Sequence, residues 1–250
     1  MKQKYDFIFS IGERCACSEA LRRSNLQFAS FPFDWLYCID FEQNAQFISH
    51  HFDGFLASER LVDMNIENGD PENPCRVYRD SQTGIVFNHD FPANLSFEHG
   101  FPLVSEKYRR RINRLYQRIQ SAKKILAVYM EAPTTNHPAA DKTQIMAGYR
   151  ILCQTFPEQE VHILYLTNQK GTLEINQLCP NVTLVAFDYK RKKPGGYDYS
   201  IDTAALAKFF KAYRLNHSLG NRIHAFVFRL LAGFIPVKLA RRRFKKKHHI

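Results

Sequence analysis

Apolar and polar positions divide most of this chain into two kinds of segment. Short continuous apolar runs, each the length of a buried strand, occur at Phe7–Ser10, Lys124–Tyr129, Val161–Leu166 and Val182–Phe187. Apolar residues at helical spacing mark 41–57, Ser105–Ala122 and Asp141–Phe156. Buried strands that alternate with amphipathic helices are typical of a mainly parallel sheet covered on both faces. The pattern therefore predicts an α/β fold with a mainly parallel sheet and helices on both faces.

A smaller antiparallel element is predicted within the first half of the chain. Arg76–Arg79 and Ile85–Asn88 flank a turn at 80–84 that contains Gly84, which favours a small β-hairpin insertion. This hairpin delivers the sequence Asn-His-Asp-Phe at 88–91. The polar stretch that ends at Pro74 is predicted to be a surface loop, and another loop is predicted to run to about residue 102.

The last part of the chain has a different composition. The formal net charge is +11, yet no Asp or Glu follows Asp202. Of the 35 Lys and Arg residues, 12 lie in 203–250, which leaves 23 in the rest of the chain against 24 Asp and Glu. We therefore predict a single, nearly neutral α/β domain at 1–215 and a basic amphipathic tail at 216–250. A neutral body argues against specific nucleic-acid binding.

The tail combines an apolar stripe at helical spacing over 223–234 with a basic cluster: Arg241, Arg242, Arg243, Lys245, Lys246 and Lys247. Its apolar part is shorter than the roughly 20 residues that span a bilayer. An apolar stripe beside a dense basic cluster favours a C-terminal helix on an anionic membrane surface. The alternatives are a core-packed last helix with a solvated end, or nonspecific RNA binding.

The six cysteines have no spacing that indicates a disulfide framework or a zinc site. The apolar run after the N-terminus is too short for a signal peptide. We expect a cytoplasmic protein, peripheral at the inner face of the cytoplasmic membrane, and we expect neither a metal nor a cofactor.

Candidate chemistry centres on Cys15. The first strand, a turn at Gly12 and a helix that opens near Glu13 place this cysteine in the first helical turn. Unpaired N–H groups and the helix dipole favour a thiolate there. Cys17 falls on the apolar face and is predicted to be core. A strand–glycine–helix opening also suits phosphate binding, by a set that would comprise Gly12, Arg14 and Arg22, with Arg109 and Arg110 of the later helix.

A cysteine nucleophile needs a base and a group that orients the base. His89 on the hairpin is the favoured base, and Asp34 or Asp90 is the candidate orienting carboxylate. Four other histidines are rivals. His162 is predicted to be core, His50 and His51 are predicted to lie on a helix surface, and His137 falls in a loop.

The motifs Ser-Ile-Gly-Glu-Arg-Cys at 10–15, Ser-Phe-Pro-Phe-Asp-Trp at 30–35, Phe-Asn-His-Asp-Phe at 87–91 and Lys-Tyr-Arg-Arg-Arg-Ile at 107–112 carry a family resemblance. The chain resembles the bacterial family of uncharacterised proteins described as "putative papain-like cysteine peptidases". That resemblance implies Cys15 as nucleophile, His89 as base and Asp34 or Asp90 as orienting carboxylate. A papain-like enzyme places its histidine on an antiparallel sheet, whereas the chain after residue 123 is predicted to be parallel α/β.

Three functions follow from these observations. The first is a cysteine-dependent hydrolase or acyl transferase that works at the membrane surface. The second is a transferase of lipopolysaccharide or capsule assembly that binds a sugar nucleotide or a lipid-linked phosphate. This alternative follows because the basic amphipathic tail of the chain resembles the tails of such enzymes. The third is a noncatalytic membrane-surface module, in which Cys15 would be incidental.

Overall fold

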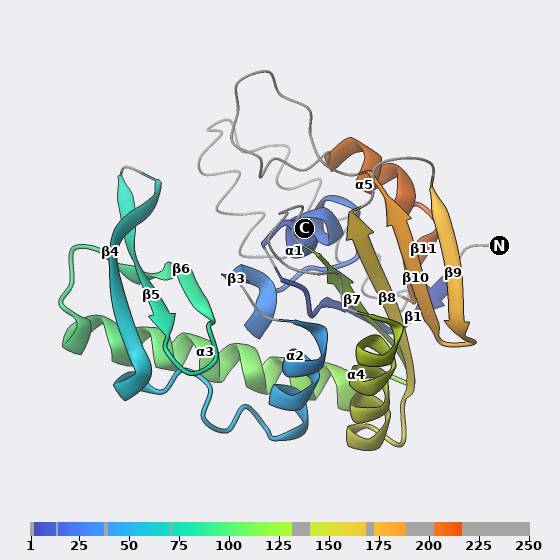
Figure 1. Cartoon of the computed structure of the whole chain (residues 1–250), viewed down its shortest axis with the longest axis horizontal. Coiled ribbons are helices and arrows are strands. Elements are labelled where there is room, and N and C mark those ends of the chain that lie inside the picture. Colours follow the sequence, from blue (N-terminus) through green and yellow to red (C-terminus); the bar gives the residue numbers. More distant parts are fainter. Residues whose placement is uncertain are drawn as a thin grey trace, which may run out of the picture.

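The structure is a computed structural model, and it describes residues 3–13, 15–37, 40–70, 72–131, 141–168, 173–188 and 203–216. These residues form a five-stranded sheet, a four-stranded sheet and a two-stranded sheet. Figure 1 shows the five-stranded sheet on one side of the molecule and the four-stranded sheet on the other.

The five-stranded sheet contains the four predicted apolar strands and one strand that was not predicted. Its order is β2 (Phe7–Ser10), β7 (Lys124–Met130), β8 (Glu160–Asn168), β10 (Val182–Phe187) and β9 (Glu174–Cys179). The first four strands are parallel, and β9 pairs with β10 in the antiparallel direction. Four of the five residues at 174–178 are exposed, so β9 lacks the apolar pattern that marks a buried strand.

Alternate residues of these strands belong to two separate cores. Phe9, Ala127 and Ile163 pack with residues of α2 (Phe41–Ser49), α3 (Phe97–Gln120) and α4 (Lys142–Thr155). Ile8, Leu126 and Leu164 pack with residues of α1 (Cys15–Arg23) and α5 (Thr203–Phe210). The prediction of an α/β fold with helices on both faces is therefore confirmed.

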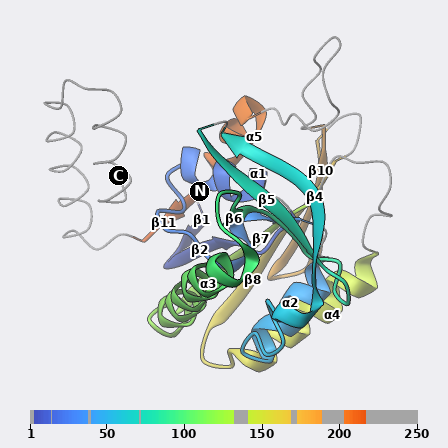
Figure 2. The same cartoon turned by 90° about the vertical axis from the view of Figure 1, so that its left-hand side faces the viewer.

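The four-stranded sheet is larger than the small hairpin insertion that the sequence predicts. It is antiparallel throughout, in the order β3 (Leu36–Tyr37), β6 (Val86–Pro92), β5 (Asn73–Asp80) and β4 (Leu61–Asp70). Figure 2 shows β4 and β5 as a long twisted pair. The prediction of a surface loop before Pro74 was wrong, because most of that stretch forms β4. The five-stranded sheet is thus mixed and the four-stranded sheet is antiparallel, in place of the single mainly parallel sheet that was predicted.

Two short 3-10 helices, η1 (Pro32–Trp35) and η2 (Ser58–Arg60), precede β3 and β4. The helix α3 also begins earlier than the predicted Ser105. Its first residue, Phe97, packs against Tyr78 and Phe91 at ring-centroid distances of 5.2 and 6.0 Å. This aromatic packing against the antiparallel sheet accompanies the additional helical turns, and the helix continues past Pro102.

The two-stranded sheet pairs β1 (Gln3–Tyr5) with β11 (Tyr213–Leu215) in parallel. The predicted tail at 216–250 lies, apart from Asn216, outside the described residues, so the domain limit at 215 stays a prediction. No helix in the described part of the chain is long and apolar enough to cross a membrane.

Two helical glycines allow a matched test of this packing. A Cβ on Gly148 would lie 2.6 Å from a ring carbon of the buried Phe41, whereas a Cβ on Gly100 would meet atoms no closer than 3.9 Å. We predict that Gly148→Ala lowers the free energy of unfolding by about 1–2 kcal/mol, since overpacking outweighs the helix-propensity gain. Gly100→Ala should raise it by roughly 0.5–1 kcal/mol. Urea unfolding checks both, and a stabilised Gly148→Ala variant would contradict the packing of α2 on α4.

Candidate active site

Cys15 is the first residue of α1 and is half-exposed. The turn before it packs tightly, because a Cβ on Gly12 would lie 2.8 Å from the backbone nitrogen of Met130 at the end of β7. Gly12 therefore allows α1 to begin beside the carboxyl ends of β2 and β7, and packing explains this glycine without a ligand. Cys17 is fully buried, and burial raises the pKa of its thiol to about 12. The expectation that Cys17 is core is confirmed.

Tyr37 connects Cys15 to the antiparallel sheet. The Cys15 Sγ lies 3.8 Å from the Tyr37 hydroxyl oxygen. Tyr37 belongs to β3, which pairs with β6 through Leu36 opposite Phe87 and Tyr37 opposite Val86. The strand β6 carries His89, so a single aromatic residue bridges the two halves of the site. Sequence reasoning missed Tyr37, because no local pattern indicates that the fold brings this residue to Cys15.

His89 lies on a bulge of β6. The partners on β5 step from Tyr78 to Arg76 while β6 advances from Phe87 to Phe91, so β6 has two extra residues there. Bulges redirect side chains and occur next to active sites. The His89 ring lies 6.4 Å from the Tyr37 ring and 6.3 Å from the Trp35 ring, between centroids. The structure thus brings Cys15 and His89 to the same tyrosine.

The electrostatic environment of His89 suits a base. Burial lowers the pKa of the imidazole below its ordinary value, and the carboxylate of Asp90 offsets part of that shift. A histidine with a lowered pKa is neutral at neutral pH and can accept a proton.

The Asp34 side chain forms no hydrogen bond or ion pair with His89 in the described part of the chain. Its buried carboxylate accepts hydrogen bonds at Oδ2 from the Arg22 guanidinium (3.0 Å), the Gln27 amide (2.7 Å) and the Phe31 backbone N–H (2.9 Å). Burial raises the pKa of Asp34, and these donors oppose the rise. The proposed role of Asp34 in orienting His89 is therefore corrected: the carboxylate instead binds the segment before β3 to α1.

Asp90 is also turned toward the protein interior. It accepts a hydrogen bond from the Tyr108 hydroxyl at 2.7 Å and forms ion pairs with Lys107 at 2.7 Å and Arg111 at 3.5 Å. These three residues belong to α3. Asp90 therefore holds the bulge that carries His89 against α3, and its effect on the imidazole is electrostatic.

The arginines expected to bind phosphate have other partners. Arg22 binds Asp34, the Ala29 carbonyl and the Ser30 hydroxyl, and its guanidinium lies 5.7 Å from the Trp35 ring. Arg109 and Arg110 are exposed and pair with Glu106 on the same helix. These contacts leave the phosphate-binding expectation at Gly12, Arg22, Arg109 and Arg110 without support, and Arg14 lies outside the described residues.

The rival histidines lie elsewhere. His50 and His51 follow the end of α2 and are exposed, and His162 lies on β8 beside a different cavity. His137 and the six basic residues at 241–247 fall outside the described residues. Among the residues that the structure describes, no group of three His, Cys, Asp or Glu could hold a metal ion.

The fold and this geometry define an α/β protein with a helix-terminal cysteine and a sheet histidine beside one tyrosine. Residues 6–148, more than half of the chain, match the family described as "Putative papain-like cysteine peptidase (DUF1796)". The chain belongs to this family.

A curated relative is "Uncharacterized protein R408" of Acanthamoeba polyphaga mimivirus, which is 27% identical over 131 residues. That alignment covers 48% of this chain and 59% of the relative. Because the relative is viral, the expected restriction of the family to bacteria is not confirmed. No solved structure is a significant match to the chain.

The buried ion pair gives a prediction about stability. Arg22→Met removes the guanidinium but leaves the Asp34 carboxylate fully buried, so we expect a loss of roughly 2–3 kcal/mol at neutral pH. Loss of Arg22 raises the pKa of Asp34 further above its ordinary value of 3.8, so the folded state holds a proton that the unfolded state releases. The variant should therefore lose stability progressively, relative to the original chain, as the pH rises from about 4 to about 7.

The matched control is Arg109→Met, which removes the same charge from an exposed ion pair. It should change stability little at either end of the range, about pH 4 and about pH 7. Urea unfolding of the three proteins at both pH values is the measurement. Equal losses in the two variants, or a pH-independent loss for Arg22→Met, would show that Asp34 does not depend on this arginine.

Proposed function

We propose that this protein is a cysteine-dependent hydrolase or acyl transferase in which Cys15 is the nucleophile and His89 is the base. The observation that supports it most is the position of Tyr37, whose hydroxyl contacts Cys15 Sγ and whose ring lies beside His89. Family membership supports cysteine peptidase chemistry in general terms. Cys15 is half-exposed, which argues against the third alternative, in which Cys15 is an incidental cysteine of a noncatalytic module.

The reaction uses groups that the site supplies. His89 accepts the thiol proton of Cys15, and the thiolate attacks a carbonyl carbon of an amide or ester. Backbone N–H groups in the first turn of α1 and the Tyr37 hydroxyl would stabilise the oxyanion. The leaving amine or alcohol takes the proton from His89, which leaves a thioester on Cys15. Water, or another nucleophile in a transferase, then displaces the thiol and releases the acyl group.

Cysteine reactivity tests the nucleophile directly. We predict that limiting iodoacetamide modifies Cys15 first and that it does so below the ordinary thiol pKa of about 8.5. Cys17 is the internal control, because its burial and raised pKa should protect it while the protein stays folded. Peptide mass spectrometry over a pH series measures both sites. Slower alkylation of Cys15 than of Cys75, whose pKa burial also raises, would contradict the proposal.

A chromogenic ester tests the covalent step. With p-nitrophenyl acetate we expect a burst of nitrophenolate from the original chain and none from Cys15→Ala. His89→Asn should slow the burst by about 10²–10⁴-fold, as expected for loss of a general base. His99→Asn is the matched control, because His99 is exposed on α3 and bonds, among the residues that the structure describes, the Ser96 hydroxyl. An undiminished burst from Cys15→Ala would overturn the mechanism. An added amine that captures the acetyl group would identify a transferase.

The proposal that the protein works at an anionic membrane surface rests on the sequence of the tail. We predict that the full chain sediments with vesicles that contain phosphatidylglycerol and that replacement of the six basic residues at 241–247 by glutamine abolishes this binding at physiological salt. Vesicles of phosphatidylcholine alone are the control. Equal sedimentation of both proteins, or equal binding to both vesicles, would contradict an electrostatic membrane interaction.

A further inference from the structure

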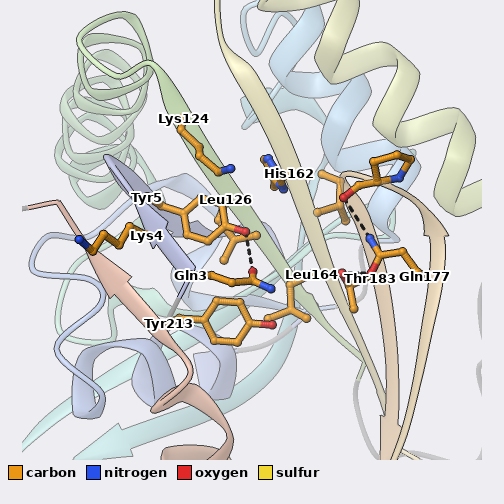
Figure 3. A pocket seen from close by; sticks show the side chains of 12 residues that line it. Gln3, Lys4, Tyr5, Lys124, Leu126, His162, Leu164, Gln177, Thr183 and Tyr213 are labelled. Atoms are coloured by element: carbon orange, nitrogen blue, oxygen red, sulfur yellow. Dashed lines mark hydrogen bonds between the residues drawn. The ribbon is translucent and has the colours of Figure 1, made fainter. Parts of the chain in front are cut away.

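A cavity of about 370 Å³ lies at the opposite end of the five-stranded sheet from Cys15. It is lined by residues of β1, β7, β8, β9, β10 and β11, near the amino ends of the parallel strands (Figure 3). The seven residues of β7 separate Lys124 at the cavity from Met130 at the cysteine edge, which is about 20 Å of extended chain. Its volume is at the lower end of the range for small-ligand sites. The cavity is thus a separate candidate site.

One wall of the cavity carries the Lys124 ammonium and the His162 imidazole, and both bond a carboxylate at the protein surface. The Lys124 ammonium and the His162 Nε2 both contact Glu160 Oε1, at 2.7 and 2.6 Å. The Glu160 side chain is 51% exposed. Exposed ion pairs contribute little free energy, so another anion can replace this carboxylate at modest cost.

The facing wall presents hydroxyl and amide groups. The Tyr5 hydroxyl donates to Gln3 Oε1 at 2.9 Å, which leaves the Gln3 amide NH₂ directed to the cavity region (Figure 3). Tyr213 is 9% exposed, lines the same cavity, and its hydroxyl has no hydrogen-bond partner among the described residues. Burial raises the pKa of Tyr213 to about 12, so the phenol remains protonated and can donate. A phenol donor that opens on a cavity and has no protein partner there can donate to an acceptor ligand.

We propose that this cavity binds a small oxyanion, the phosphate or carboxylate group of a small molecule, between Lys124 and the Tyr213 hydroxyl. Ammonium, imidazole and phenol donors around one small space match the several acceptor oxygens of such a group. The exposed carboxylate of Glu160 contacts the Lys124 ammonium and the His162 imidazole, and the ligand displaces it. This proposal does not depend on Cys15 chemistry, because the two sites share no residue.

Isothermal titration calorimetry of the full chain with inorganic phosphate and, separately, with acetate tests the proposal. Lys124→Met should weaken binding about tenfold, because a charge-assisted contact is lost. Glu160→Gln should strengthen binding about threefold, because the competing carboxylate is removed. Lys123→Met is the matched control: it removes the same charge from the adjacent residue, which does not line the cavity, and should leave the affinity unchanged.

Each outcome decides the question. Opposite effects of Lys124→Met and Glu160→Gln support the site, and the stronger of the two probes identifies the oxyanion. Because Glu160 is exposed, Glu160→Gln is expected to fold even if Lys124→Met does not, and its effect alone then tests the site. An original chain that shows no saturable heat with either probe would overturn the proposal. Equal weakening by Lys123→Met and Lys124→Met would also overturn it, since only general charge would then be involved.

Discussion

The buried carboxylate of Asp34 is the constraint on which the cysteine site depends. It binds Arg22 from α1 and the backbone of Phe31, and Ser18 Oγ lies within hydrogen-bond distance of the Cys15 and Asp34 carbonyl oxygens. Cys15 begins that helix, and Tyr37 follows Asp34 by three residues. One carboxylate therefore fixes both sides of the Cys15–Tyr37 contact, so its removal would loosen the site without touching a reacting atom.

The second constraint comes from the shape of the antiparallel sheet. Both neighbours of β5 bulge beside Val77: β4 between Asp63 and Glu67, and β6 between Phe87 and Phe91. Phe87 and Phe91 both stay in the core, so the extra residues of β6 carry His89 toward Tyr37 while Asp90 is anchored on α3. The imidazole is thus positioned by aromatic packing on one side and by a buried carboxylate on the other.

Sequence patterns predicted the parts of this fold that hydrophobic burial determines. The four apolar strands and the position of Cys15 at a helix start follow from local spacing. The strand β4 was missed although Val62, Met64 and Ile66 alternate with polar residues, which is a strand pattern. These three side chains are exposed, so backbone pairing with β5 rather than burial holds the strand. The role of Asp34 was missed for a different reason: its partner Arg22 lies on a helix face that the sequence alone does not orient toward it. Tyr37 meets Cys15 only through the fold of η1 and β3.

The match to the peptidase family bears unequally on the two sites. Cys15, Tyr37 and His89 all fall within 6–148, together with the whole antiparallel sheet. That region contains the antiparallel strand β6, which carries His89, whereas the sequence pattern after residue 123 predicts parallel α/β structure. The cavity beside Lys124 and Tyr213 has two lining residues in the matched region, Lys124 and Leu126. Its other lining residues lie before residue 6 or after residue 148. The family match therefore covers the residues of the proposed cysteine site and little of the cavity, whose chemistry has to be established on this chain itself.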